Sequence, residues 1–163
     1  MLTTGIFSVV LVTSCKNKCG STTCQNGGAC TDNLCVCPIG FSGNACQTGW
    51  TDIFVATYKC QRYNCTPAVT GDTTYWQSAI TKDATNPGYT IDISNFDNSN
   101  TTVAATVDSN INGVSNIEVS TVTGTYGINA TGTYSNDTIR LKFTTSSVGG
   151  VGGYTCQMVL GKE

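Results

Sequence analysis

The sequence predicts an all-β protein in which a disulfide-rich module is followed by an antiparallel β-meander. Thr, Ser and Asn together make up about a third of the 163 residues, whereas Glu occurs only at positions 118 and 163. Thr and Val favour strands, Asn and Gly favour turns, and residues with high helix propensity are scarce. Nine of the ten cysteines precede residue 66. That density is typical of a small exported domain stapled by disulfides.

The composition argues against nucleic-acid binding and against catalysis. Eight Lys and Arg residues and a net charge of −2 leave no basic stripe for a phosphate backbone. The chain has no histidine, which removes the usual general base, the Ser–His and Cys–His nucleophile pairs and the commonest zinc ligand. We therefore expect a non-enzymatic protein without a cofactor and without a nucleic-acid partner.

The first 14 residues have the character of a signal peptide. They carry no charge, and their apolar run at residues 6–12 is too short to span a bilayer. The run ends in Leu11-Val12-Thr13-Ser14-Cys15, which resembles the lipobox of bacterial lipoproteins. The resemblance implies lipidation of Cys15, residues 15–18 as a short linker, and an anchor in the Gram-negative outer membrane on an undetermined side. The alternatives are an ordinary secretory signal and a structured first strand.

Six cysteines fall within residues 19–46, and their spacing alone leaves many pairings open. The segments Cys24-Gln25-Asn26-Gly27-Gly28-Ala29-Cys30 and Cys35-Val36-Cys37-Pro38-Ile39-Gly40-Phe41-Ser42-Gly43-Asn44-Ala45-Cys46 resemble an EGF-like module. The resemblance implies bridges between Cys19 and Cys30, between Cys24 and Cys35, and between Cys37 and Cys46.

No metal site is expected in either part of the chain. Calcium-binding EGF-like modules carry acidic and amide residues before the first cysteine and an aromatic residue between the third and fourth. This chain has Lys16-Asn17-Lys18 and no such aromatic. The oxygen-rich stretch at residues 92–100 lacks the residue order of a calcium loop and is better explained as a strand that ends in an Asx-rich turn.

Residues 50–161 form the second predicted domain. Alternation and β-branched content predict eight strands separated by short turn sequences, as expected for a meander. Closing the sheet would remove its edges, so we predict a small up-and-down barrel, with a β-sandwich as the alternative. The predicted strands are residues 51–60, 73–81, 89–94, 102–107, 116–122, 128–134, 138–145 and 154–160.

The alternation also predicts which side chains face the core. The inward sets are Phe54, Ala56, Tyr58 and Cys60; Ile91, Ile93 and Phe96; and Ile139, Leu141 and Phe143, with Arg140 and Lys142 outward. Segments 54–58, 93–96 and 154–156 resemble a recurring C-terminal domain of small bacterial lipoproteins that has no established activity.

Three cysteines remain for the second domain. We predict a bridge between Cys65 and Cys156, which leaves Cys60 as a buried free thiol. A bridge between Cys60 and Cys156 and an intermolecular bridge remain open. A catalytic role for Cys60 is not expected, because no imidazole can activate it.

Two groups of residues are candidates for the surface. Tyr75, Trp76 and Tyr89 fall near strand ends, where aromatic side chains can contact a partner. Asp72-Thr73-Thr74 and Asp137-Thr138-Ile139 resemble the O-glycosylation motif that some Gram-negative bacteria use on exported proteins, which would modify Thr73 and Thr138. Both sequences also suit an ordinary turn before a strand.

The function that these features favour is that of a membrane-tethered envelope lipoprotein acting as a non-catalytic binding, accessory or adhesion module. The EGF-like unit would serve as a rigid spacer, and the partner would be an envelope protein or a glycan. The alternative is a calycin-like carrier of a small hydrophobic ligand, for which the inward faces look too small and too rich in Thr.

Overall fold

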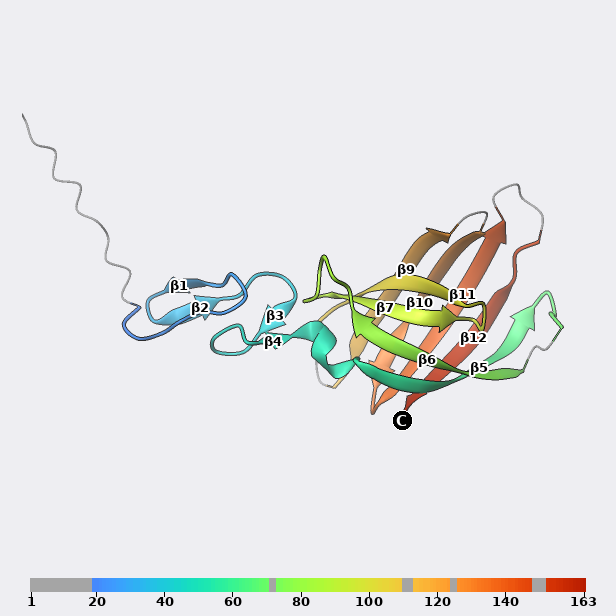
Figure 1. Cartoon of the computed structure of the whole chain (residues 1–163), viewed down its shortest axis with the longest axis horizontal. Helices are drawn as coiled ribbons and strands as arrows, with labels where there is room; N and C mark the ends of the chain where they lie inside the picture. Colours follow the sequence, from blue (N-terminus) through green and yellow to red (C-terminus); the bar gives the residue numbers. More distant parts are fainter. Residues whose placement is uncertain (1–18, 71–72, 110–112, 124–125, 148–151) are drawn as a thin grey trace, which may run out of the picture.

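The computed structural model describes residues 19–70, 73–109, 113–123, 126–147 and 152–163. Figure 1 shows a slender N-terminal module joined end to end with a larger barrel. The described part of the chain contains no helix with the length and apolar character of a membrane span. Cys15 and the predicted signal peptide lie outside the described residues.

The N-terminal module consists of two short hairpins. β1 (Ala29–Thr31) pairs with β2 (Leu34–Val36), and β3 (Phe41–Ser42) pairs with β4 (Thr48–Gly49). Asp32 and Asn33 connect β1 to β2 with φ values of 50° and 64°. Two adjacent residues in the left-handed region are what a two-residue hairpin loop requires, and Asp and Asn tolerate this conformation.

The C-terminal domain is a closed barrel of eight antiparallel strands, so the predicted fold is confirmed and the sandwich alternative is wrong. Each strand pairs with the next along the chain, and β12 closes the barrel against β5. The strands are β5 (Ala56–Thr66), β6 (Thr74–Lys82), β7 (Thr90–Phe96), β8 (Thr101–Val107), β9 (Ser115–Thr123), β10 (Tyr126–Ser135), β11 (Thr138–Ser147) and β12 (Thr155–Lys162).

The predicted start of the first barrel strand is wrong. Trp50–Ile53 forms a 3₁₀ turn, which the Asp52 carboxylate stabilises by accepting a hydrogen bond of 2.8 Å from the Gly49 N–H. The strand begins at Ala56 and runs beyond the predicted end at residue 60, because β12 continues to pair with it. Cys60 and Cys65 consequently lie on the same strand.

The barrel interior is filled by side chains, as expected for eight strands. Phe96 and Phe143 pack edge to face with ring centroids 5.3 Å apart, and Phe54 packs against Tyr134 at 4.7 Å. Ala56 is only half-buried, and Met158 and Leu160 of β12 add to the core. The other predicted inward side chains are all buried: Phe54, Tyr58, Cys60, Ile91, Ile93, Phe96, Ile139, Leu141 and Phe143.

Candidate binding site at the distal mouth of the barrel

The barrel has a near end, which meets the EGF-like module, and a distal end opposite to it. Gly40 of the module lies against Gly88, which precedes β7, and the Thr51 hydroxyl donates to the Pro87 carbonyl. The Trp50 N–H donates a hydrogen bond of 2.9 Å to the Gly40 carbonyl. These contacts join the module and the 3₁₀ turn to the segment that precedes β7 at the near end.

A buried ion pair crosses the distal end. β7 runs away from the module, so Asp97, which follows it, reaches the distal mouth. Arg62 on β5 points into the same mouth, and its Nη1 lies 2.7 Å from Asp97 Oδ1. The two side chains are 11% and 7% exposed. Arg62 Nη2 also donates to Thr74 Oγ1 at 3.4 Å.

Tyr154 completes this polar cluster. Its hydroxyl donates to Asp97 Oδ2, and the Arg62 guanidinium carbon lies 6.0 Å from the centre of its ring. Burial, helped by the hydrogen bond to the Asp97 carboxylate, raises the pKa of Tyr154 to about 12. The tyrosine is therefore neutral at physiological pH, and the positive and negative charges of Arg62 and Asp97 cancel within the cluster.

A cavity of about 260 Å³ lies at this mouth. The ladder between β8 and β9 consists of three residue pairs and stops at Ala105 and Val119, which leaves the distal parts of these strands outside it. The lining combines hydroxyl groups with aromatic and aliphatic surface, and Tyr126 is 54% exposed. The lining residues are Asp97, Ser99, Thr101, Tyr126, Ile128, Thr145 and Tyr154.

The three aromatic residues proposed from the sequence do not form one surface. Tyr75 is 70% exposed and accepts a hydrogen bond of 3.1 Å from Gln61 Nε2. Trp76, the next residue on β6, faces inward and packs against the core, because successive strand residues point to opposite sides. Tyr89 lies at the near end, where it lines a separate cavity with Ile39.

Of the two candidate O-glycosylation residues, Thr73 is exposed just before β6. Thr138 is half-buried at the start of β11, and its hydroxyl donates to the Asn136 carbonyl at 3.2 Å. The described residues contain no group of three His, Cys, Asp or Glu side chains arranged to hold a metal ion. In the oxygen-rich stretch at residues 92–100, the Asp97 carboxylate pairs with Arg62 and accepts a hydrogen bond from Tyr154.

Four disulfides occur among the described residues; three have the partners that the EGF-like resemblance implies, and the fourth is the bridge predicted for the barrel. Cys60 is a buried free thiol. Burial raises the pKa of Cys60 to about 12, so the reactive thiolate is not populated at neutral pH. The bridges are Cys19–Cys30, Cys24–Cys35, Cys37–Cys46 and Cys65–Cys156.

The residues that build the distal mouth were not predicted from the sequence. One feature of the sequence could have indicated them: Arg62 falls on the same alternating face of β5 as Tyr58 and Cys60. A charged residue on an inward face must find a partner, since an unpaired buried charge is strongly unfavourable. The identity of that partner, Asp97, depends on how the barrel closes.

Comparison with known proteins finds a family match in the N-terminal part of the chain. Residues 19–45 match the family model of the EGF-like domain. A stretch of 55 residues, 32% of this chain, is 42% identical to Protein NEL of Gallus gallus. The matched region spans only 7% of that protein's length. No solved structure matches the chain. The EGF-like domain is thus supported by sequence and structure, whereas the barrel is described by the structure.

Proposed function

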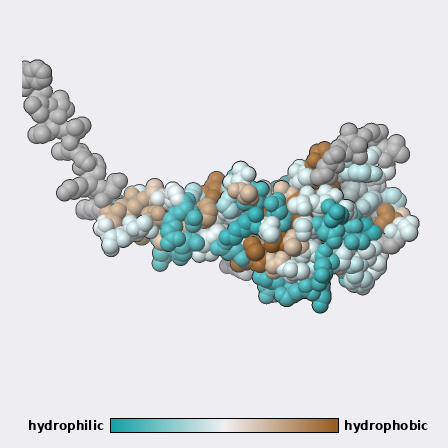
Figure 2. Space-filling view, viewed as in Figure 1, coloured by the Kyte–Doolittle hydropathy of each residue, from teal (hydrophilic) through white to brown (hydrophobic). Residues whose placement is uncertain are grey.

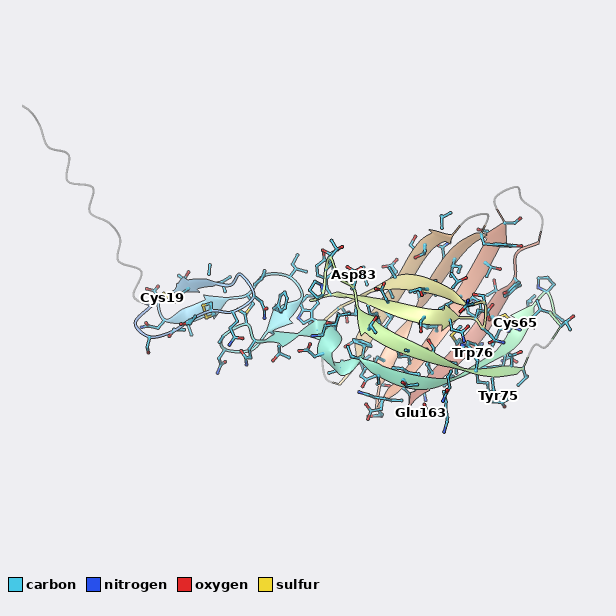
Figure 3. All side chains as sticks on the ribbon, viewed as in Figure 1. Cys19, Cys65, Tyr75, Trp76, Asp83 and Glu163 are labelled. Carbon is cyan, nitrogen blue, oxygen red and sulfur yellow. A yellow bond between two sulfur atoms is a disulfide. The ribbon has the colours of Figure 1, made fainter. Side chains whose placement is uncertain are left out.

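We propose that this protein is a non-catalytic binding module that is held at a membrane by a lipid on Cys15 and binds its partner at the distal mouth. The observation that carries the proposal is the position of the mouth cavity at the end of the barrel remote from the EGF-like module. Figure 3 shows Cys19 and Cys65 at opposite ends of the molecule. An anchor at residue 15 would therefore direct the cavity away from the lipid surface.

The EGF-like domain at residues 19–45 supports a binding or adhesion role, and its packing on the barrel supports its use as a rigid spacer. In this proposal the protein is an envelope lipoprotein of the outer membrane, and its partner is a component of the same envelope. The lipobox-like sequence ending in Cys15 supports the anchor. Cys60 is buried and protonated, which supports a role without nucleophilic catalysis.

The chemistry of the mouth favours a neutral ligand with hydroxyl groups, such as a sugar unit of an envelope glycan. The charges of Arg62 and Asp97 cancel, so the cavity offers little attraction to a charged group. Ser99, Thr101 and Thr145 contribute hydroxyl groups to the lining. The rings of the two lining tyrosines can pack against the apolar face of a sugar ring.

Saturation-transfer NMR with neutral envelope oligosaccharides tests the binding site. Tyr126→Ala is expected to weaken binding by about fivefold or more, the usual cost of losing a contact worth about 1 kcal/mol. Tyr75→Ala is the matched control, because Tyr75 is an exposed tyrosine on the outer face of β6. Equal affinity of the two variants and the unaltered protein would place the binding site elsewhere.

The anchor is tested by the intact, non-reduced mass of the protein taken from the host membrane fraction. The expected mass lacks residues 1–14, carries added acyl chains and retains one thiol that can be alkylated after unfolding. A mass without acyl chains would contradict the anchor and leave the mouth cavity as the binding site of a diffusible protein.

A calycin-like carrier is the second candidate, and the closed eight-stranded barrel with a cavity at its mouth favours it. Packing of Phe96 against Phe143 fills the interior below the mouth, so the cavity has room for a small ligand and not for a long acyl chain. Native mass spectrometry distinguishes the two candidates, because a carrier would retain a bound lipid.

A further inference from the structure

The EGF-like module carries an exposed apolar face on its first hairpin. Leu34 is 72% exposed and Val36 is 60% exposed, although both belong to a strand. Cys35, between them, points to the opposite side and is bonded to Cys24. Leu34 is paired with Thr31, and Val36 is paired with Ala29, so the same face continues across β1 without a charged side chain.

This apolar face lies at the end of the module where the chain enters it. A Cβ atom on Gly20 would lie 3.7 Å from Oδ1 of Asn33, which places the turn of the first hairpin beside the residue that follows Cys19. Figure 2 shows this end of the module as the part farthest from the barrel among the coloured residues. The apolar face is therefore remote from the barrel and adjacent to the predicted anchor.

The module has few charged residues, which favours contact with a lipid surface. Asp32 is the single charged residue between positions 19 and 49. A surface with so few charges loses little hydration when it contacts the interfacial region of a bilayer, and its apolar side chains gain from leaving water. Lys16 and Lys18 precede the module in the sequence, and basic residues next to a membrane favour anionic headgroups.

The length of the linker limits how far the module can stand from an anchored lipid. Cys15 and Cys19 are four residues apart in the sequence, and four extended residues span about 14 Å at most. The headgroup region on each side of a bilayer is itself about 5–7 Å thick. A lipid on Cys15 would therefore keep the start of the module within about 10 Å of the headgroup region.

We infer that the apolar face formed by Leu34 and Val36 rests on the lipid surface and fixes the orientation of the module at the membrane. This contact rests on the proposed lipid anchor and goes beyond it, since a tether alone would leave the module free to swing. With the hairpin seated on the headgroups and the barrel packed rigidly on the module, the distal mouth is held at a defined distance from the membrane.

Photolabelling tests the contact directly. The full lipidated protein is placed in phosphatidylcholine vesicles whose acyl chains carry a diazirine, illuminated, reduced, digested and mapped by mass spectrometry. Lipid adducts are expected on residues 29–36 in clear excess over those on β9, where Val122 is 72% exposed like Leu34 and serves as an internal reference.

Substitutions then identify the side chains that make the contact. The double variant Leu34→Ser and Val36→Ser is expected to lose most of the adducts on the hairpin, whereas Val122→Ser leaves them unchanged. All three positions are exposed, so the fold should be retained, and the non-reduced mass verifies that the disulfides are intact.

The outcomes separate the contact from the anchor. An acylated protein whose hairpin is labelled no more than β9 would overturn the membrane contact and leave the anchor standing. A protein without acyl chains would overturn both. Dimers crosslinked through the hairpin without lipid adducts would show that a second copy of the chain covers this face, which also overturns the membrane contact.

Discussion

Arg62 and Asp97 form an ion pair across the distal mouth of the barrel, with a distance of 2.7 Å between Nη1 and Oδ1. They are 35 residues apart in the sequence and lie on β5 and at the end of β7. Both charges are largely removed from water. Each is stable there because the other is present, and because Tyr154 and Thr74 provide further hydrogen bonds.

Replacing Asp97 with Ala is expected to lower the free energy of unfolding by about 3 kcal/mol, because Arg62 would stay buried without its counter-charge. Urea unfolding followed by circular dichroism measures the change. The double variant Arg62→Met with Asp97→Leu provides the control, since it removes both charges together. It should be more stable than Asp97→Ala. Equal losses in both variants would contradict a role for the uncompensated charge.

Removing the bridge between Cys65 and Cys156 is expected to lower the stability of the barrel by about 2–5 kcal/mol. The bridge closes a loop with a sequence separation of 91 residues, which restricts the unfolded chain strongly. The double variant Cys65→Ala and Cys156→Ala is compared with Cys60→Ala, which alters a buried cysteine on the same strand that has no bridge. A loss no larger than that of Cys60→Ala would contradict the prediction.

The barrel should lose stability between about pH 10 and pH 12. Burial raises the pKa of Tyr134 and Tyr154 to about 12, whereas in the unfolded chain tyrosine titrates near 10. Above pH 10 the unfolded state releases protons that the folded state retains, so the free energy of unfolding falls until the folded tyrosines ionise as well. Unfolding measured across this range, with Tyr154→Phe as the comparison, should show a weaker pH dependence in the variant.

Substitution of Gly88 by Ala should loosen the junction between the module and the barrel. A Cβ atom there would lie 2.7 Å from the ring of Phe41 and 3.1 Å from the Gly40 carbonyl oxygen, so the two domains must separate. NMR relaxation is expected to show faster, independent tumbling of residues 19–46. Gly161→Ala is the control, because a Cβ at that position meets nothing within 4 Å. Unchanged relaxation in Gly88→Ala would show that the junction absorbs the methyl group.

The alternation of apolar residues predicted the strands and their inward faces, because that pattern is local to each strand. Ile139, Leu141 and Phe143 illustrate this, since their spacing alone places them on one face. The 3₁₀ turn at Trp50–Ile53 was not predicted, because Asp52 stabilises it through one short-range hydrogen bond that no periodicity records.

The distal mouth was harder to predict for a different reason. Asp97 belongs to a turn. The turn sequence predicts the local backbone conformation, but it does not predict which strand lies opposite. Its partner on β5 is determined by closure of the barrel, and the cavity depends further on where the ladder between β8 and β9 ends. Tyr75 and Trp76 were both predicted to lie at the surface, because they fall near a strand end. Consecutive residues of a strand point to opposite faces of the sheet, so Tyr75 is exposed and Trp76 packs against the core.

The pairing of β12 with β5 has a consequence for how the chain is assembled. Every other strand pair in the barrel joins neighbours in the sequence, so seven hairpin contacts can form one after another as the chain emerges. The last pairing joins the first and final strands, and until it forms β5 and β12 each expose an open edge that could recruit a foreign strand. Pairing of β12 with β5 also brings Cys156 next to Cys65. It is therefore the step that removes the last open sheet edges, and with them the sites at which foreign strands could add and cause aggregation.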